Sequence, residues 1–270
     1  MSVYVERRGR GPDLVLLHGW GMNGAVWQGL APRLEADFRL HLVDLPGFGH
    51  SPALPAHAGL DDWAAAVLGA VPDEAAWLGW SLGGLVATHA ALQAPMRVRS
   101  LITLASSPRF VAGDDWPGIK PAVLAAFEQQ LAEDHRQVVN RFLALQAMGS
   151  EHAREDIRQL RDSLAQKPAP DPAALAAGLA LLGDVDLRTG LSRLQLPMLR
   201  LYGRLDGLVP KKAVALVDAL APHSQSHVEP RASHASFISH PEATAEQIRA
   251  FLLNVAGRQD PDTGLSISVS

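Results

Sequence analysis

The stretch AAWLGWSLGG at residues 75–84 decides the fold of this chain. Its apolar first half is typical of a buried strand, and the small-residue run LVATHAAL at residues 85–92 is typical of a helix. A serine at the turn between them, with glycines at G-x-S-x-G spacing, is the signature of a nucleophile elbow. Gly79 and Gly83 leave room for the strained backbone that such a turn imposes on Ser81. The sequence therefore predicts a nucleophilic serine at a helix N-terminus, where free N–H groups favour developing negative charge.

Strands and helices are expected to alternate along the first part of the chain. The strands are expected at residues 2–6, 13–17, 38–43, 75–79 and 98–104, and the helices at 23–34, 60–70 and 83–93. Continuous apolar runs such as Leu14-Val15-Leu16-Leu17 indicate strands that are buried on both faces. This alternation predicts a parallel sheet with helices on both of its faces.

The middle of the chain breaks this alternation. From about residue 107 to residue 187 there is no convincing strand pattern, and helices are expected at 123–131, 137–148, 153–165 and 172–182. Alternation resumes with strands at 198–202 and 226–229 and helices at 213–220 and 243–255. We therefore expect a core of residues 1–107 and 188–256, a helical cap of residues 108–187, and a disordered tail of residues 257–270.

The composition argues against several classes of protein. The 270 residues carry a net charge of −4 and no cysteine, which argues against a polyanion-binding protein and excludes disulfides and thiol catalysis. No apolar segment has the pattern of a signal peptide or the length of a bilayer span, so we expect a cytoplasmic protein with neither membrane nor nucleic acid as partner. The histidines and carboxylates show no metal-ligand spacing, and we expect neither metal nor cofactor.

Two residues that follow late strands supply the base and the acid that a serine nucleophile needs. In a parallel sheet, functional groups gather beyond the carboxyl ends of the strands. Asp206 and His234 each come directly after an expected late strand. Asp44 also follows a strand but precedes the serine, so we assign it a structural role in a turn. The order Ser81, Asp206, His234 matches the order in α/β-hydrolases and predicts nucleophile, acid and base.

Two backbone N–H groups are expected to stabilise the oxyanion of an acyl-transfer reaction. One belongs to Leu82, the residue after the nucleophile. The other belongs to Trp20, in the loop His18-Gly19-Trp20 that follows the first buried strand. The Trp20 indole is also expected to form a wall of the acyl pocket.

Eight segments between about residue 13 and residue 245 add to these general motifs: LVLLHGWG, LHLVDLPGFGHS, WLGWSLGGLVA, ASSPRF, DWPGIKP, RFLALQAMG, LRLYGRLDGLVP and SHASFISHP. Together they resemble the pimeloyl-[acyl-carrier protein] methyl ester esterases of biotin synthesis, which belong to the α/β-hydrolase superfamily. The resemblance implies a mostly parallel sheet with helices on both faces and an all-helical cap inserted after the sixth strand. It also implies a carboxylesterase that converts the methyl ester of pimeloyl-acyl-carrier protein into pimeloyl-acyl-carrier protein and methanol.

The same resemblance implies which residues contact the substrate. In the family, the acyl chain contacts the tryptophan of HGW, the elbow serine and leucine, and the cap run FLALQ. In this chain the implied substrate contacts are Trp20, Ser81, Leu82, Phe142, Leu143, Ala144, Leu145, Gln146 and His234. From the residues alone, the apolar cap side chains either line such a pocket or pack the cap onto the core.

The cap arginines allow two interpretations. Arg154, Arg158 and Arg161 share one helical face, and Arg141 begins the FLALQ run. Residues 130–170 hold six basic and six acidic side chains, so the residues alone favour a solvated helix face with internal ion pairs. The resemblance instead implies that Arg141, Arg154 and Arg158 dock an acidic acyl carrier protein that bears the pimeloyl methyl ester. We expect the enzyme to be a monomer.

Three other functions stay open at this point. The chain could hydrolyse other short-chain esters, or it could use the same fold and triad to cleave carbon–carbon bonds or to act as a lyase. It could also be a receptor that binds a small ligand in the pocket. Haloalkane dehalogenation is disfavoured, because that reaction needs an aspartate at the position of Ser81.

Overall fold

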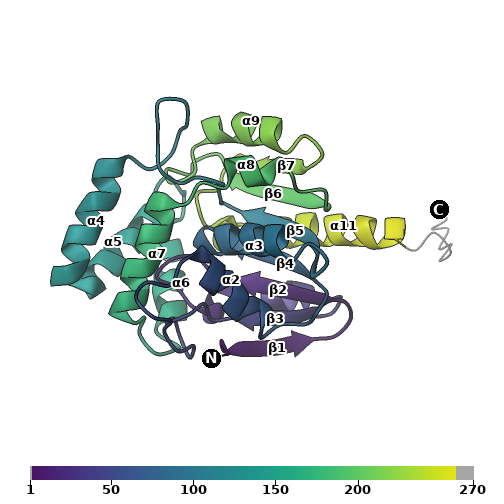
Figure 1. Cartoon of the computed structure of the whole chain (residues 1–270), viewed down its shortest axis with the longest axis horizontal. Helices are drawn as coiled ribbons and strands as arrows, with labels where there is room; N and C mark the ends of the chain where they lie inside the picture. Colours follow the sequence, from purple (N-terminus) through teal and green to yellow (C-terminus); the bar gives the residue numbers. More distant parts are fainter. Residues whose placement is uncertain (1, 260–270) are drawn as a thin grey trace.

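A computed structural model of the chain describes residues 2–259, with a seven-stranded sheet at the centre (Figure 1). The spatial order is β1-β3-β2-β4-β5-β6-β7, and β1 pairs antiparallel with β3 while the other described pairs are parallel. The strands are β1 (Val5–Gly9), β2 (Asp13–Leu17), β3 (Arg39–Val43), β4 (Ala75–Trp80), β5 (Val98–Leu104), β6 (Met198–Gly203) and β7 (Gln225–Glu229). The expected mostly parallel sheet is confirmed.

Helices cover both faces of the sheet (Figure 1). One layer holds α2 (Leu60–Leu68), α3 (Leu82–Gln93), α8 (Arg188–Leu191) and α9 (Lys211–Leu220), and the other holds the 3₁₀ helix η1 (Gly24–Gly29), α1 (Ala31–Leu34) and α11 (Pro241–Gln259), which α10 (Ser236–Ser239) precedes. The helix expected at 23–34 is thus two short helices. Pro32 lies in the first turn of α1, where a residue without an N–H group starts a helix but does not continue one.

The strand register brings three loops to one edge of the sheet. β2 lies between β3 and β4, and Leu14 to Leu17 are fully buried there. Leu17 pairs with Val43 on one side and with Gly79 on the other. Because these parallel strands end at the same level, the loops that follow them meet beyond their carboxyl ends, where open parallel sheets place their functional groups.

Four longer helices between β5 and β6 lie beyond this edge (Figure 1). They are α4 (Pro121–Glu133), α5 (His135–Gln146), α6 (Ala153–Leu164) and α7 (Pro172–Asp184). We call them the cap. The implied position after the sixth strand is wrong for the described residues, in which the five strands β1 to β5 precede the cap.

The last described helix reaches into the predicted tail. α11 ends at Gln259, whereas the core was expected to end at residue 256. Burial of Ile248 and Phe251 anchors this helix to the core. The rest of the predicted tail, residues 260–270, lies outside the described residues.

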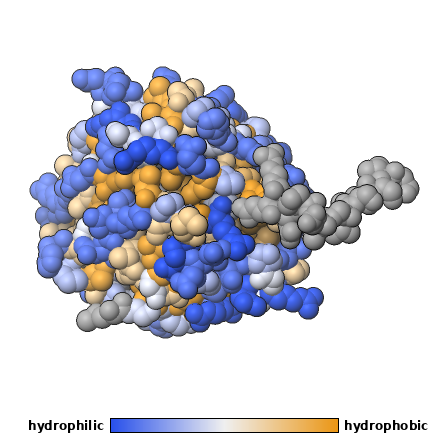
Figure 2. Space-filling model, turned by 45° about the vertical axis from the view of Figure 1, so that its right-hand side comes forward, coloured by the Kyte–Doolittle hydropathy of each residue, from blue (hydrophilic) through white to orange (hydrophobic). Residues whose placement is uncertain are grey.

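The described surface is a mixture of polar and apolar residues. Figure 2 shows a face on which hydrophobic residues form a band bordered by hydrophilic ones. The large hydrophobic residues that are exposed are Tyr4, Met96, Val123, Met148, Leu216 and Leu253. Among the helices of residues 2–259, none has both the length and the apolar character needed to cross a bilayer.

Candidate active site

Ser81 occupies the sharp turn that its glycine neighbours predict. β4 ends at Trp80, α3 begins at Leu82, and Ser81 between them has φ 54° and ψ −120°. A side chain at position 79 would place its Cβ 2.2 Å from the carbonyl oxygen of Gly83. A side chain at position 83 would place its Cβ 2.4 Å from the carbonyl oxygen of Leu17. Both glycines are therefore required by close backbone packing, and the strained serine conformation persists because this packing imposes it.

The structure brings the three predicted triad residues together. The Ser81 Oγ lies 2.9 Å from the His234 Nε2, and the His234 Nδ1 lies 2.8 Å from the Asp206 Oδ2. All three residues are buried. The other Asp206 oxygen, Oδ1, accepts hydrogen bonds from the backbone N–H groups of Leu208 (2.8 Å) and Val209 (3.0 Å). These two bonds hold Oδ1, so that Oδ2 faces the imidazole and accepts its Nδ1–H. The unprotonated Nε2 can then accept the hydroxyl proton of Ser81.

The cap holds the loop that carries His234. The backbone N–H of His234 donates to the carbonyl of Gln146, the last residue of α5, at 3.2 Å. The neighbouring Ser233 hydroxyl donates to the carbonyl of Met148 at 2.7 Å. From the core side, the Trp80 indole N–H donates to the His234 carbonyl at 3.0 Å. The imidazole is therefore positioned from two sides, and one of them is the cap.

The expected oxyanion N–H groups lie on adjoining segments. A Cβ at Gly19 would lie 3.2 Å from the Ser81 Cβ, so the loop that carries Trp20 packs directly against the elbow. Within residues 2–259, the backbone N–H groups of Trp20 and Leu82 donate to no other protein group. Two free donors next to the serine hydroxyl are what an oxyanion site requires.

Two hydrogen bonds hold the His18 imidazole in one tautomer, and through them His18 fixes this loop. Its Nε2 accepts the backbone N–H of Leu45 at 2.9 Å, so its Nδ1 carries the proton, and Nδ1 lies 2.8 Å from the Gly19 carbonyl oxygen. Complete burial lowers the pKa of His18 from 6.5 to about 4 and keeps the imidazole neutral. His18 therefore acts as a structural anchor of the predicted oxyanion loop.

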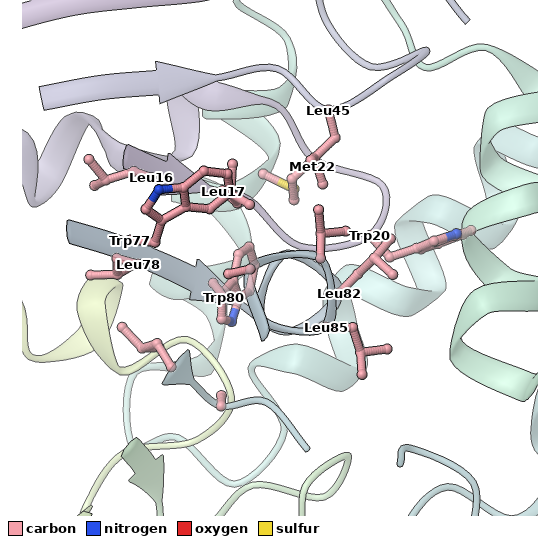
Figure 3. Close-up of a cluster of buried hydrophobic side chains, with 14 of the residues drawn as sticks. Leu16, Leu17, Trp20, Met22, Leu45, Trp77, Leu78, Trp80, Leu82 and Leu85 are labelled. Atoms are coloured by element: carbon pink, nitrogen blue, oxygen red, sulfur yellow. The ribbon is translucent and has the colours of Figure 1, made fainter. Parts of the chain in front are cut away.

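Trp20 joins the loop to the cap. Figure 3 shows its side chain pointing from the loop toward the cap helices, away from Trp77 and Trp80 among the sheet residues. The indole N–H donates to the carbonyl of Leu175 in α7 at 2.8 Å, and the ring lies 4.8 Å, centroid to centroid, from Phe142 in α5. Trp20 and Phe142 thus form an aromatic wall between the loop and the cap.

The cap run FLALQ meets this wall only in part. Phe142, Leu143 and Gln146 are buried, and Leu145 is half-buried. Ala144 is exposed, so the implied contact of Ala144 with an acyl chain is not supported by its place on α5. The reason is the helical repeat: successive residues turn by about a hundred degrees, and a helix buries one stripe rather than a continuous run.

The three implied docking arginines lie on the outside of the cap. Arg141 donates to the side-chain oxygen of Gln130 and lies over the ring of Phe127. Arg158 forms an ion pair with Glu155 at 2.7 Å, and its hydrogen bond lowers the pKa of that carboxyl below its usual value. Arg154 is exposed. One of the three arginines therefore already has a carboxylate partner within its own helix.

The structure contains a buried ion pair between cap and core that the sequence analysis did not predict. Lys167, in the segment between α6 and α7, places its Nζ 2.9 Å from the Asp44 Oδ1, and both side chains are almost completely buried. Asp44 also accepts the backbone N–H groups of Gly24 (2.7 Å) and His50 (2.9 Å), which fits the structural role assigned to it. No local motif marks Lys167, because only the fold brings its segment to the loop that follows β3.

Comparison with known proteins places this geometry in context. A family profile described as alpha/beta hydrolase fold matches residues 12–241. The pimeloyl-[acyl-carrier protein] methyl ester esterase of Aeromonas salmonicida is 61% identical over 253 residues, which cover 93% of this chain and 100% of that protein. The protein of the same name from Pectobacterium atrosepticum is 54% identical and covers 93% of this chain and 98% of its own length.

Solved structures share the fold at lower identity. An esterase from Exiguobacterium antarcticum superposes with a TM-score of 0.83 at 24% identity, covering 93% of this chain and 95% of the esterase. An enol-lactonase from Burkholderia xenovorans superposes with a TM-score of 0.81 at 17% identity, covering 93% of this chain and 96% of that chain. At these identities the likeness shows the common architecture and no more.

Proposed function

This chain belongs to the α/β-hydrolase fold family and, within it, to the pimeloyl-[acyl-carrier protein] methyl ester esterases, and we propose from this that it removes the methyl group from pimeloyl-acyl-carrier protein methyl ester in biotin synthesis. The enzyme is a carboxylic ester hydrolase. The observation that carries the mechanism is the unbroken chain of hydrogen bonds from the Ser81 hydroxyl through the His234 imidazole to the Asp206 carboxylate.

In the first half of the reaction, the Ser81 Oγ attacks the ester carbonyl carbon while the His234 Nε2 takes the hydroxyl proton. The carbonyl oxygen becomes an oxyanion, and the free N–H groups of Trp20 and Leu82 stabilise it. Collapse of this intermediate breaks the bond to the methoxy oxygen. His234 returns its proton to that oxygen, methanol leaves, and the pimeloyl chain stays on Ser81 as an ester.

In the second half, water replaces methanol as the reactant. His234 takes a proton from the water as the hydroxide oxygen attacks the acyl-enzyme carbonyl, and the same two N–H groups stabilise the second oxyanion. Return of the proton to Ser81 releases a carboxylic acid that remains attached to its carrier. Asp206 keeps the imidazole oriented throughout and stabilises its positive charge.

The character of the wall supports an alkyl substrate. Trp20, Leu82 and Phe142 are buried apolar residues on the side of the site that faces the cap. Such a lining favours the methylene chain of a pimeloyl ester over the charged intermediates that carbon–carbon bond hydrolases and lyases receive.

The test of the nucleophile is Ser81→Ala. This variant is expected to lose about six orders of magnitude in kcat on a short p-nitrophenyl ester and on the pimeloyl-carrier methyl ester, as removal of a serine nucleophile does elsewhere. Ser192→Ala is the matched control, because Ser192 is exposed and lies outside the site. Retention of more than a hundredth of the activity by Ser81→Ala would rule out this nucleophile.

The carrier protein is proposed to dock on the exposed cap arginines Arg141, Arg154 and Arg158. The support is their exposure on the neighbouring helices α5 and α6 and the acidic character of carrier proteins. The double variant Arg154→Glu/Arg158→Glu is expected to raise KM for the carrier-bound ester by about tenfold, with a smaller effect at high salt. Arg193→Glu, an exposed arginine outside the cap, controls for net charge. We also expect a monomeric enzyme in the cytoplasm.

A further inference from the structure

Among residues 2–259, two residues other than glycine have a positive φ, and they follow neighbouring strands. Ser81, at φ 54°, follows Trp80 at the end of β4. Ala105, at φ 46°, follows Leu104 at the end of β5, and Leu104 pairs with Trp80 in the sheet. Such a conformation costs energy in a residue with a side chain and persists only where the surrounding structure imposes it. The second strained turn therefore indicates a function beside the elbow.

The turn at Ala105 places the next side chain against the elbow. The buried Ser106 hydroxyl donates to the Ser81 carbonyl oxygen at 2.8 Å. The backbone N–H of Ser81 donates to the Leu104 carbonyl at 3.0 Å. The end of β5 therefore holds both backbone polar groups of the proposed nucleophile.

Gly84 is the glycine of the elbow that the G-x-S-x-G spacing does not explain. A Cβ at this position would lie 2.3 Å from the Ser106 Oγ and 2.4 Å from the Ser106 Cβ. The backbone N–H of Gly84 also donates to the Ser81 carbonyl oxygen, at 2.9 Å. The missing side chain at Gly84 therefore leaves the space in which Ser106 reaches that carbonyl.

The Ser81 carbonyl belongs to the same peptide unit as the Leu82 N–H, which is one of the two expected oxyanion donors. Because a peptide unit is planar, a hydrogen bond that fixes its carbonyl oxygen also fixes the direction of its N–H group. A hydrogen bond to the carbonyl also polarises the unit and makes its N–H a stronger donor. The Ser106 hydroxyl can therefore act on the oxyanion site through one peptide bond.

We propose that Ser106 is a positioning residue for the reaction, which orients and polarises the Leu82 N–H through the Ser81 carbonyl. The inference rests on the proposed function and deepens it. The oxyanion forms only when the Ser81 Oγ attacks the ester. Loss of the Ser106 hydroxyl is therefore expected to weaken binding of the transition state and of the tetrahedral intermediate, but not of the intact ester.

The test compares two ketones of equal chain length, an aliphatic trifluoromethyl ketone and the corresponding methyl ketone. The Ser81 Oγ adds to the activated carbonyl carbon of the first, its proton passes to His234, and the ketone oxygen becomes an oxyanion. The methyl ketone is far less activated and measures binding without this addition. In Ser106→Ala, the inhibition constant of the trifluoromethyl ketone is expected to rise about tenfold, with that of the methyl ketone unchanged. On a p-nitrophenyl ester, kcat is expected to fall about tenfold at constant KM.

Ser107→Ala is the matched control. Ser107 is also buried, but its hydroxyl donates to the Arg109 carbonyl at 2.6 Å, so this variant is expected to keep kcat and both inhibition constants. A second pair, Ser106→Thr and Ser106→Val, has side chains of nearly equal size that differ in the hydroxyl, so a shared steric effect cancels between them. The threonine variant is expected to bind the trifluoromethyl ketone about tenfold more tightly than the valine variant. This pair decides the point if Ser106→Ala does not fold.

The outcomes separate this proposal from the proposed function. If Ser106→Ala weakens both ketones equally, Ser106 supports the pocket and not the oxyanion site, and the proposal is wrong. Unchanged constants in Ser106→Ala, or equal affinities of the threonine and valine variants, would also overturn it. If the unaltered enzyme binds the trifluoromethyl ketone no more tightly than the methyl ketone, Ser81 does not add to a carbonyl and the proposed function itself fails.

Discussion

The backbone N–H of His234 donates to the carbonyl of Gln146, so the base of the proposed triad is held by the last turn of a cap helix. The two residues are far apart in the sequence, and Gln146 belongs to the cap. The cap therefore contributes to the position of the imidazole as well as to the wall of the pocket.

Ser233→Ala tests this link. The change removes the hydroxyl that donates to the Met148 carbonyl at 2.7 Å, so the loop before His234 loses one of its bonds to the cap. We expect a loss of about 1 kcal/mol in the free energy of unfolding and a fall in kcat of several-fold. Urea unfolding and hydrolysis of a p-nitrophenyl ester measure the two effects. Unchanged kcat together with reduced stability would show that the bond supports the fold but not the base.

Lys167→Met is expected to destabilise the protein strongly. The Asp44 carboxylate would remain buried with its two backbone donors but without a counter-charge, and such a broken buried pair costs about 3–5 kcal/mol. Chemical denaturation measures the loss. The double variant Asp44→Asn/Lys167→Met removes both charges and is expected to recover a large part of it. Equal stability of the single and double variants would show that the pair is not coupled.

Stability is expected to fall as the pH drops from about 6.5 toward 4, because His18 has a pKa of about 4 when folded and 6.5 when unfolded. Over this range the unfolded chain takes up a proton that the folded one does not. The difference amounts to roughly 3 kcal/mol below pH 4 and vanishes above pH 6.5. Denaturant titrations across this range, with His18→Asn as the comparison, isolate the contribution. A variant with the same pH dependence as the unaltered enzyme would contradict it.

Two glycines of α7 give a matched pair of substitutions. A Cβ at Gly178 would lie 2.9 Å from the Trp20 Cδ1 and 3.2 Å from the Leu82 Cδ2, whereas a Cβ at Gly183 meets no atom within 4 Å. Gly183→Ala is expected to add about 0.5–1 kcal/mol of stability through helix propensity, with normal activity. Gly178→Ala is expected to displace the indole and lower kcat/KM by about tenfold. Equal activity of the two variants would show that Trp20 adjusts freely.

Local chemistry made much of the site predictable. The elbow depends on glycines two residues from Ser81, and the sheet topology requires Asp206 and His234 to follow late strands, so their convergence could be inferred from spacing alone. The partner of Asp44 could not, because Lys167 lies in a segment that only tertiary packing brings to the loop after β3. The exposure of Ala144 could not be predicted either, since the side of α5 that faces inward depends on contacts with other elements.

The bond from the Trp20 indole to the Leu175 carbonyl has a consequence for engineering. One side chain joins the core, which carries the proposed triad, to the cap. Grafting the cap of another hydrolase onto this core would therefore change the alignment of the reactive groups at the same time as the specificity, unless the graft preserves an acceptor at that point of α7.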